Sequence, residues 1–265
     1  MIKYGLGVIL YNPTDNQLLN LQRYLDMNIF EKIYAFDNSK DLLKKKIPIT
    51  IDYHYMGGNL GLSIPYNIMI KDAIKHDYDF LCIMDQDTLF EKDDICRITR
   101  YIDQNLSKLE EVSIVCPNIA TNSEQIKRSE SQTFVKWTIN SASFLNLRNV
   151  SKNSLFYDEN IFLDGVDYEY CMNIRKHHQK ILRIDGAYIV QNFGNTNDKS
   201  SFAHHDAIRY YYLSQSRMYM YRKHYGVLGS IYAILLNIRL VFRVLMHEDK
   251  KADKTWACLK GMLKW

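Results

Sequence analysis

The stretch of sequence that decides the fold is Phe80-Leu81-Cys82-Ile83-Met84-Asp85-Gln86-Asp87-Thr88-Leu89-Phe90. Its apolar first half predicts a strand that ends at Met84 and is covered on both faces. Such a strand delivers Asp85 and Asp87 to its carboxyl end, where open α/β sheets bind ligands. Two nearby carboxylates suit Mg²⁺ or Mn²⁺, which take their other ligands from water and substrate phosphates. The alternative is an ordinary acidic loop followed by helix-capping residues.

The first 120 residues alternate strand-like and helix-like segments, which predicts right-handed βαβ units and a mostly parallel sheet. Further along the chain, a polar stretch predicts a loop, and from His205 onward the pattern becomes nearly continuous helix. We therefore expect an α/β domain over residues 1–204 and a helical region over residues 205–265. The expected strands are 5–10, 32–36, 47–53, 80–84, 112–116, 181–184 and 188–190; the expected helices are 17–27, 64–75 and 95–105, with a loop at 121–131, an extended segment at 137–147 and a segment at 157–175 that opens with acids and becomes helical.

Composition excludes several classes of protein. A chain of 265 residues with 47% hydrophobic content can bury one large core. The 34 basic and 30 acidic residues are too balanced for a dedicated nucleic-acid binder. The five scattered cysteines include no C-x-x-C pair, so neither a disulfide framework nor a zinc site is indicated, and a reducing cytosol fits. The N-terminus has no signal-peptide pattern, so we do not expect export.

Two further polar segments follow predicted strands, Tyr11-Asn12-Pro13 and Asp37-Asn38-Ser39. An acid after the second strand can accept hydrogen bonds from ribose hydroxyls or a base imide, although a plain turn is the alternative. The loop Gly57-Gly58-Asn59-Leu60-Gly61 precedes a helical pattern, and its bare backbone could approach a base or a phosphate. It is neither a G-x-G-x-x-G fingerprint nor a P-loop, which argues against a dehydrogenase or a kinase.

A second acidic cluster is Asp164-Gly165-Val166-Asp167-Tyr168-Glu169. Its three carboxylates repel one another, so in a cleft one of them should have a raised pKa and could act as a general base toward a substrate hydroxyl. The alternative is that the acids begin a helix and complement its dipole. Both descriptions can hold at once.

Taken in order, these motifs resemble the family 2 glycosyltransferases, specifically their bacterial rhamnosyltransferase-like branch. The resemblance covers nearly the whole chain, and the Asp-Gln-Asp form of the first acidic motif is typical of that branch. The segments that carry it are 7–13, 37–39, 58–62, 84–87, 162–171 and 205–212.

The resemblance implies a GT-A fold with a C-terminal helical extension, a nucleotide-sugar donor and inversion at the anomeric carbon by one direct displacement. It implies that Asp85 and Asp87 hold Mg²⁺ or Mn²⁺ on the donor diphosphate. It also implies that Asp167 is the base, with Asp164 the second choice and Glu169 a supporting residue. The remaining donor-site residues that it implies are Tyr11, Asn12, Asp37, Gly58, Asn59 and Gly61.

The chain departs from the family pattern at several positions. Asn173 stands where relatives commonly carry Arg, with Arg175 two residues on, and Gln191 stands where they commonly carry His. These changes leave the third metal or diphosphate contact open. His205 and Arg209 match the family's later His and Arg and could bind the diphosphate instead. The family's Arg-Asn after the tyrosines is Gln-Ser at 215–216, which allows a different donor.

The C-terminal region contains an apolar stripe at helical spacing. Arg239, Arg243 and Lys250 lie on another face, and the two interior arginines argue against a transmembrane span. The stripe either packs on the catalytic domain or a second subunit, or it lies in the plane of a membrane, aided by nearby lysines. The stripe is Ile231, Ile234, Leu235, Ile238, Val241, Phe242 and Leu245; the lysines are Lys250, Lys251, Lys254, Lys260 and Lys264.

The leading hypothesis is a cytoplasmic, membrane-associated, metal-dependent enzyme that transfers L-rhamnose from a dTDP donor to a growing capsule or O-antigen glycan or a lipid-linked oligosaccharide. Alternatives keep the mechanism with a UDP donor and transfer galactofuranose, glucose or galactose. A nucleotidyltransferase is the alternative of another enzyme class. It would require a basic residue in its first strand-helix turn, and Tyr11-Asn12-Pro13-Thr14 has none. A scaffold without turnover is the non-enzyme alternative.

Overall fold

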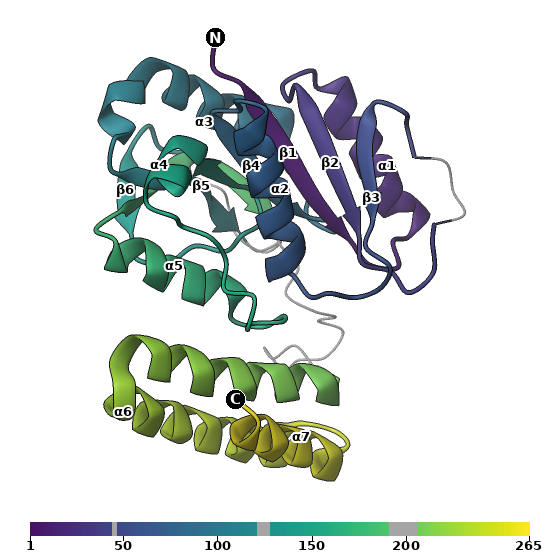
Figure 1. The fold of residues 1–265 in the computed structure, drawn as a ribbon, viewed down its shortest axis with the longest axis vertical. Coiled ribbons are helices and arrows are strands. Elements are labelled where there is room, and N and C mark those ends of the chain that lie inside the picture. The colour runs from purple at the N-terminus through teal and green to yellow at the C-terminus, as the bar shows by residue number, and fades with distance from the viewer. Residues whose placement is uncertain (44–46, 121–127, 191–205) are drawn as a thin grey trace. The chain divides into compact units, whose positions relative to one another are not determined.

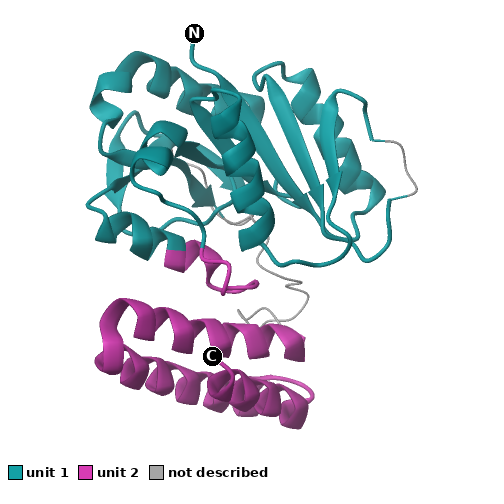
Figure 2. Ribbon diagram, viewed as in Figure 1, with its two compact units in different colours: residues 1–157, 170–191 teal, residues 158–169, 192–265 magenta. Residues whose placement is uncertain are grey.

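The computed structural model describes residues 1–43, 47–120, 128–190 and 206–265 (Figure 1). The chain forms two compact units (Figure 2). The sheet unit comprises residues 1–157 and 170–191, and the helical unit comprises residues 158–169 and 192–265. The helical unit therefore includes the segment with the second acidic cluster as well as the C-terminal helices.

The described strands form one mixed sheet in the order β3-β2-β1-β4-β7-β5-β8-β6. Strand β1 pairs in parallel with β2 and β4, as do β2 with β3 and β5 with β8, whereas β7 and β6 run antiparallel to their neighbours. The expected α/β class with a mostly parallel sheet is thus confirmed. The strands are β1 (Tyr4–Leu10), β2 (Lys32–Asp37), β3 (Ile51–Tyr55), β4 (Phe80–Asp85), β5 (Val112–Ala120), β6 (Gln132–Val135), β7 (Ser143–Asn146) and β8 (Lys180–Val190).

Helices cover both faces of the sheet. Leu6, Val8 and Leu10 of β1 share one hydrophobic cluster with apolar residues of α1 and α3. On the other face Gly7 lets α2 approach closely, since a Cβ there would lie 2.6 Å from the Met69 sulfur. The helices of the sheet unit are α1 (Asp15–Asp26), α2 (Ser63–Lys75), α3 (Lys92–Asn105) with the short η1 (Leu106–Leu109), and α4 (Leu147–Lys152); α5 (Val166–Lys176) begins in the helical unit.

Helix α1 shows how local sequence fixes an element next to a strand end. Thr14 is its N-cap and accepts a hydrogen bond from the Gln17 amide, while the Gln17 side chain accepts one from the Thr14 amide at 2.8 Å. This reciprocal arrangement satisfies two backbone donors that would otherwise be unpaired and is worth about 1 kcal/mol. The turn after β1 is therefore short and well defined.

The structure differs from the sequence prediction in several places. The third strand was expected from residue 47, but β3 begins at Ile51. Residues 137–147 were expected to be extended, but only Ser143–Asn146 form a strand, and α4 begins at Leu147. The two short strands expected at 181–184 and 188–190 are one strand, β8, with a register irregularity opposite Pro117 and Asn118. The short edge strand β6 was not expected, because its exposed residues carry little apolar signal. Residues 121–127 of the predicted loop lie outside the described residues.

The helical unit contains α6 (Ala207–His247) and α7 (Lys251–Leu263). Gly226, with φ 62° and ψ −141°, breaks α6 into a first arm, 207–225, and a second arm, 227–247. The arms pack against each other, since the Asn237 side chain donates to the Ser214 carbonyl at 3.2 Å and Tyr221 meets Tyr232 edge to face. Among the described helices α6 alone is long and apolar enough to cross a membrane, with 28% of its most apolar window buried.

Candidate active site

The carboxyl ends of β1, β2 and β4 meet at one edge of the sheet. Register pairs Leu10 with Asp37 and Ile9 with Asp85, so these two acids lie on either side of the end of β1. Tyr11 and Asn12 follow β1 directly, and Asn12 has a positive φ of 45°. The predicted donor-site residues at the ends of β1, β2 and β4 are thus brought to one edge of the sheet.

Asp37 ties the neighbouring strand ends together. Its carboxylate is fully buried and accepts hydrogen bonds from the Tyr53 hydroxyl at 2.7 Å and the Ser39 amide at 2.9 Å. The Ser39 hydroxyl in turn accepts from the Asn12 amide at 2.8 Å. Asp37 therefore orders the loops after β1 and β2, and its contact with a nucleoside stays a prediction.

Asn38 connects the glycine loop to this edge. Its side-chain amide donates to the Gly61 carbonyl at 2.6 Å, and Asn59 accepts from the Gly61 amide at 3.0 Å. Gly58 has φ 143°, and an added Cβ there would meet nothing within 4 Å. Glycine is therefore needed at this position for its backbone conformation, and the space above it is open for a ligand.

The acidic motif after β4 forms a tight turn. The Thr88 amide donates to the Asp85 carbonyl at 3.2 Å, and the Ser141 hydroxyl donates to Thr88 at 2.8 Å and accepts from the Asp85 amide at 3.0 Å. Gln86 bridges to Tyr11 through two hydrogen bonds, accepting from its amide at 2.8 Å and donating to its carbonyl at 3.1 Å. Gln86 thus fixes the loop after β1 to the acidic motif after β4.

Asp85 and Asp87 fit a hard divalent cation. Asp85 is half-buried and its Oδ1 lies 3.4 Å from the Tyr66 hydroxyl, while Asp87 is exposed. No group of three or more His, Cys, Asp or Glu side chains suited to a metal occurs among the described residues. Two oxygen ligands from the protein are what Mg²⁺ or Mn²⁺ uses when a phosphate completes the shell. The donor set therefore agrees with a cation that is held jointly with a diphosphate.

The second acidic cluster lies at the start of α5, in the helical unit. Burial, together with the smaller effect of the negative charge of Asp164, raises the pKa of Asp167 to about 6. Asp164 itself is paired, because its Oδ1 lies 2.9 Å from a guanidinium nitrogen of Arg209. Asp167 consequently has the pKa expected of a general base near neutral pH, whereas Asp164 is engaged in an ion pair.

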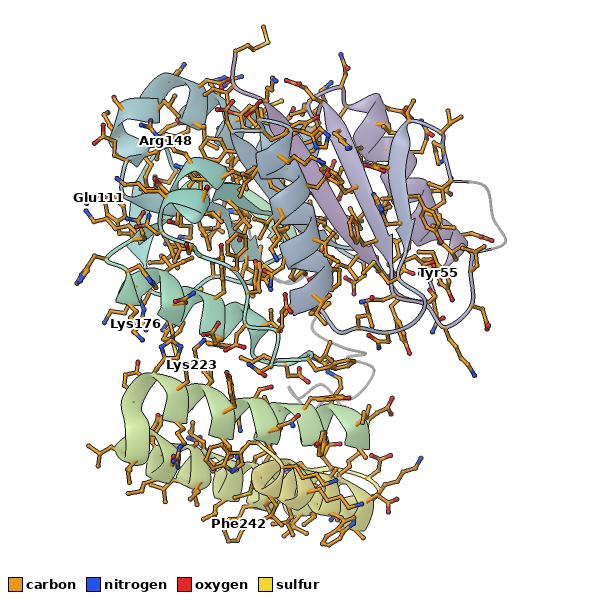
Figure 3. All side chains as sticks on the ribbon, viewed as in Figure 1. Tyr55, Glu111, Arg148, Lys176, Lys223 and Phe242 are labelled. Atoms are coloured by element: carbon orange, nitrogen blue, oxygen red, sulfur yellow. The ribbon has the colours of Figure 1, made fainter. Side chains whose placement is uncertain are left out.

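Lys223 clamps the two ends of this acidic segment. Its ammonium group lies 2.7 Å from Asp158 and 2.5 Å from Glu169, and the His224 ring nitrogen lies 3.0 Å from the same Glu169 oxygen. The Tyr219 hydroxyl adds a 2.8 Å hydrogen bond to Asp158. The first arm of α6 therefore anchors the segment that carries Asp164 and Asp167 (Figure 3).

The remaining predicted residues lie either outside the described residues or on α5. His205 and Gln191 lie outside the described residues. Asn173 lies on α5, where its carbonyl accepts from the His177 amide, and the Arg175 guanidinium stacks 4.2 Å from the Trp137 ring centroid. Arg175 is therefore occupied by an aromatic partner.

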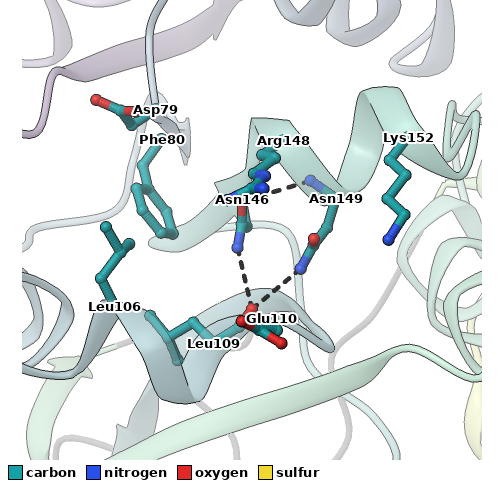
Figure 4. A pocket seen from close by; sticks show the side chains of 9 residues that line it. All are labelled: Asp79, Phe80, Leu106, Leu109, Glu110, Asn146, Arg148, Asn149 and Lys152. Carbon is teal, nitrogen blue, oxygen red and sulfur yellow. Dashed lines mark hydrogen bonds between the residues drawn. The ribbon is translucent and has the colours of Figure 1, made fainter.

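A separate cavity of about 260 Å³ lies by the start of β4 and the end of β7, opposite the edge that carries Asp85 (Figure 4). The Asn146 and Asn149 side chains both donate to the Leu109 carbonyl there. These asparagines satisfy buried backbone carbonyls, which is a structural task. None of the predicted site residues lines this cavity.

Comparisons with known proteins agree with this geometry. No model of a known protein family matches the chain. The Shigella flexneri protein dTDP-rhamnosyl transferase RfbF is 26% identical over 263 residues, which covers 91% of this chain and 85% of that protein. The chain is a glycosyltransferase that resembles the family 2 enzymes.

Solved structures show the fold of this glycosyltransferase. A crystal structure of S. aureus TarS superimposes with a TM-score of 0.58 at 13% identity and covers 99% of this chain and 80% of that one. A TarS structure in complex with UDP-GlcNAc gives the same TM-score of 0.58 at 16% identity, with 97% and 79% covered. The expected GT-A fold is therefore confirmed.

Sequence analysis of the glycosyltransferase missed the residues that hold the predicted site residues in position. Gln86 was quoted only as part of the acidic motif, and Ser141 and Lys223 were not singled out. Nothing in the spacing of Lys223 points to Asp158 or Glu169, since the contact joins positions more than fifty residues apart. Only the fold brings these partners together.

Proposed function

We propose that the protein transfers L-rhamnose from dTDP-rhamnose to a growing surface glycan, with inversion at the anomeric carbon. The observation that carries the proposal is the acidic turn Asp85-Gln86-Asp87 at the carboxyl edge of a GT-A sheet, next to Asp37 and the glycine loop. The relative named as a dTDP-rhamnosyl transferase supports the choice of donor.

The proposed reaction is one displacement at the anomeric carbon. The bond from that carbon to the diphosphate oxygen breaks as a bond to the acceptor hydroxyl oxygen forms, and the hydroxyl proton passes to Asp167. A pKa of about 6 makes Asp167 mostly ionised at neutral pH and still basic enough to accept the proton. A Mg²⁺ or Mn²⁺ ion on Asp85 and Asp87 would neutralise the charge that develops on the diphosphate.

The donor nucleotide is the most specific part of the proposal. A UDP-sugar donor is the alternative, because Gln215 and Ser216 replace residues that the rhamnosyltransferase-like pattern carries. Either donor would use the same ordered edge, where Gln86 holds Tyr11 and Asn38 holds the glycine loop. The sugar would then be distinguished by side chains that touch its ring.

We further propose that the acceptor is a capsule or O-antigen glycan, or an oligosaccharide on a carrier lipid, at the inner face of the cell membrane. Support comes from the exposed apolar residues of α6, among them Leu235, Phe242 and Met246, which are 59%, 62% and 70% exposed. Exposed apolar surface beside basic residues is typical of proteins that bind a membrane surface.

Calorimetric titration of dTDP, UDP and GDP, with Mn²⁺ and with EDTA, tests the donor assignment. The proposal predicts metal-dependent binding with dTDP the tightest. Preference for UDP would retain the mechanism and replace the sugar. No binding of any nucleotide would favour the scaffold alternative and contradict the proposed function.

A further inference from the structure

A groove of about 490 Å³ in the helical unit is lined by basic and apolar side chains. It lies along the second arm of α6 and is bordered by Arg217 of the first arm. Arg217, Arg239 and Arg243 supply the charge, and Leu236, Phe242 and Met246 supply most of the apolar lining. None of the residues that the proposed transfer reaction uses belongs to this groove.

Two of these arginines have no carboxylate partner. Neither Arg217 nor Arg239 forms an ion pair or a hydrogen bond with any residue in the described parts of the chain. The nearby acid Glu248 is already engaged, since it accepts from the Tyr210 hydroxyl at 2.8 Å and lies 2.6 Å from the Lys254 ammonium. The charges of Arg217 and Arg239 therefore have no carboxylate counterion among the described residues.

The Arg217 guanidinium is destabilised in its charged form. Burial lowers the pKa of its guanidinium, and the positive charge of Arg243 lowers it further. A half-buried cation without a carboxylate partner is costly unless an anion binds it. Guanidinium groups bind phosphate oxygens in particular, through paired N–H donors.

The apolar residues around the groove indicate which kind of molecule bears the bound anion. Phe242 and Met246 line it and remain mostly exposed, and Phe242 projects from the second arm (Figure 3). Leu235, Ile238 and Leu245 of the same arm are also exposed, at 59%, 43% and 45%. A free phosphate would bind the arginines but would leave this apolar surface in water, whereas a lipid would cover it.

We propose that this groove binds the phosphate headgroup of an anionic membrane lipid, with Arg217 and Arg239 on the phosphate and Phe242 and Met246 against the acyl region. The proposal extends the membrane association proposed above and does not depend on sugar transfer. It predicts an in-plane orientation for the second arm, because a spanning orientation would place Arg239 and Arg243 in hydrocarbon.

Sedimentation of the full-length protein with vesicles tests the proposal. Vesicles of phosphatidylcholine with phosphatidylglycerol should bind the protein, and pure phosphatidylcholine vesicles should bind it weakly. Each arginine near an anionic surface contributes about fivefold in affinity, so R217Q/R239Q should weaken binding by about 25-fold. The matched control is R148Q/K152Q, which removes the same charge from exposed positions of the sheet unit and should change binding less than about twofold.

Two further experiments distinguish binding of a lipid headgroup from binding of a free phosphate. The exposed variant F242S should weaken vesicle binding without changing the unfolding temperature, and inorganic phosphate at matched ionic strength should fail to displace the vesicles. Displacement by phosphate, equal losses in both charge variants, or no wild-type binding to the anionic vesicles would each overturn the proposal. Nucleotide titration of R217Q/R239Q should match the wild type, which separates a failed lipid site from a failed proposed function.

Discussion

Asp167 is the side chain on which the proposed displacement depends. Its raised pKa follows from burial and from the adjacent Asp164 charge. The variant D167N should lower kcat by about 100-fold or more, since general-base catalysis contributes at least that much, while dTDP binding persists. Retained transfer by D167N would remove this residue from the base role.

The pH dependence of transfer provides a second test at the residue scale. The base must be ionised, so kcat/KM should rise as pH increases through about 6 and then level off. In D164N the neighbouring negative charge is gone and ionisation of Asp167 becomes easier, so the acidic limb should move to lower pH. A pH–rate profile of both proteins measures this, and a limb that stays in place or moves upward would contradict the assignment.

Residue positions could be predicted from the sequence where the strand topology fixes them, but not where they depend on loop conformation. Asp37 and Asp85 could be placed at one edge because parallel strands end on the same side, and the register bears this out. The bonds of Gln86 to Tyr11 could not be foreseen, because they depend on how two loops curl after their strands. The ion pair of Arg209 with Asp164 likewise needs the fold.

The link between the acidic segment and α6 is tested at the scale of elements. In K223M, Asp158 and the buried Glu169 lose a shared cation, so we expect the free energy of unfolding to fall by about 1–3 kcal/mol. Because Asp167 lies on the clamped segment, kcat should fall as well. Urea unfolding and donor turnover measure the two effects.

The control for K223M is K176M, which removes an exposed lysine from the last turn of α5. It should leave both unfolding and turnover nearly unchanged, because exposed charges contribute little. If K223M behaved like K176M, the clamp would have no role in holding the segment.

The hairpin of α6 depends on two glycines for different reasons. Gly229 is in close contact, since a Cβ there would lie 2.0 Å from the Tyr221 carbonyl oxygen, while Gly226 needs a positive φ but has open space. G226A should cost about 1 kcal/mol of strain, and G229A should cost more, about 1–3 kcal/mol, because the arms must separate. Thermal unfolding of the two variants measures their relative stability. G229A should be the less stable of the two, and the opposite order would contradict the packing argument.

Prediction of the elements succeeded where the apolar period was strong and failed where tertiary context decided. Helices α1, α2 and α3 begin and end within three residues of expectation. The C-terminal region reads as nearly continuous helix because a single glycine gives little signal, yet the φ of Gly226 reverses the chain. The exposed edge strand β6 has no alternating apolar pattern to detect.

On the scale of the whole molecule, each compact unit contributes different chemistry. The sheet unit provides the ordered strand edge with Asp85 and Asp87, and the helical unit provides Asp167 and the basic groove around Arg239. A boundary at 204 to 205 was expected from the helical pattern. The compact helical unit of the structure also includes residues 158–169, which are distant in sequence from the C-terminal helices.

The most direct test of metal-dependent sugar transfer is the rate at which purified wild-type protein releases dTDP from dTDP-rhamnose with Mn²⁺, compared with EDTA and with D85N. We predict release with Mn²⁺, little with EDTA, and a rate at least about 100-fold lower for D85N, since the cation stabilises the leaving diphosphate by several kcal/mol. Release that is unaffected by EDTA and by D85N would contradict the account.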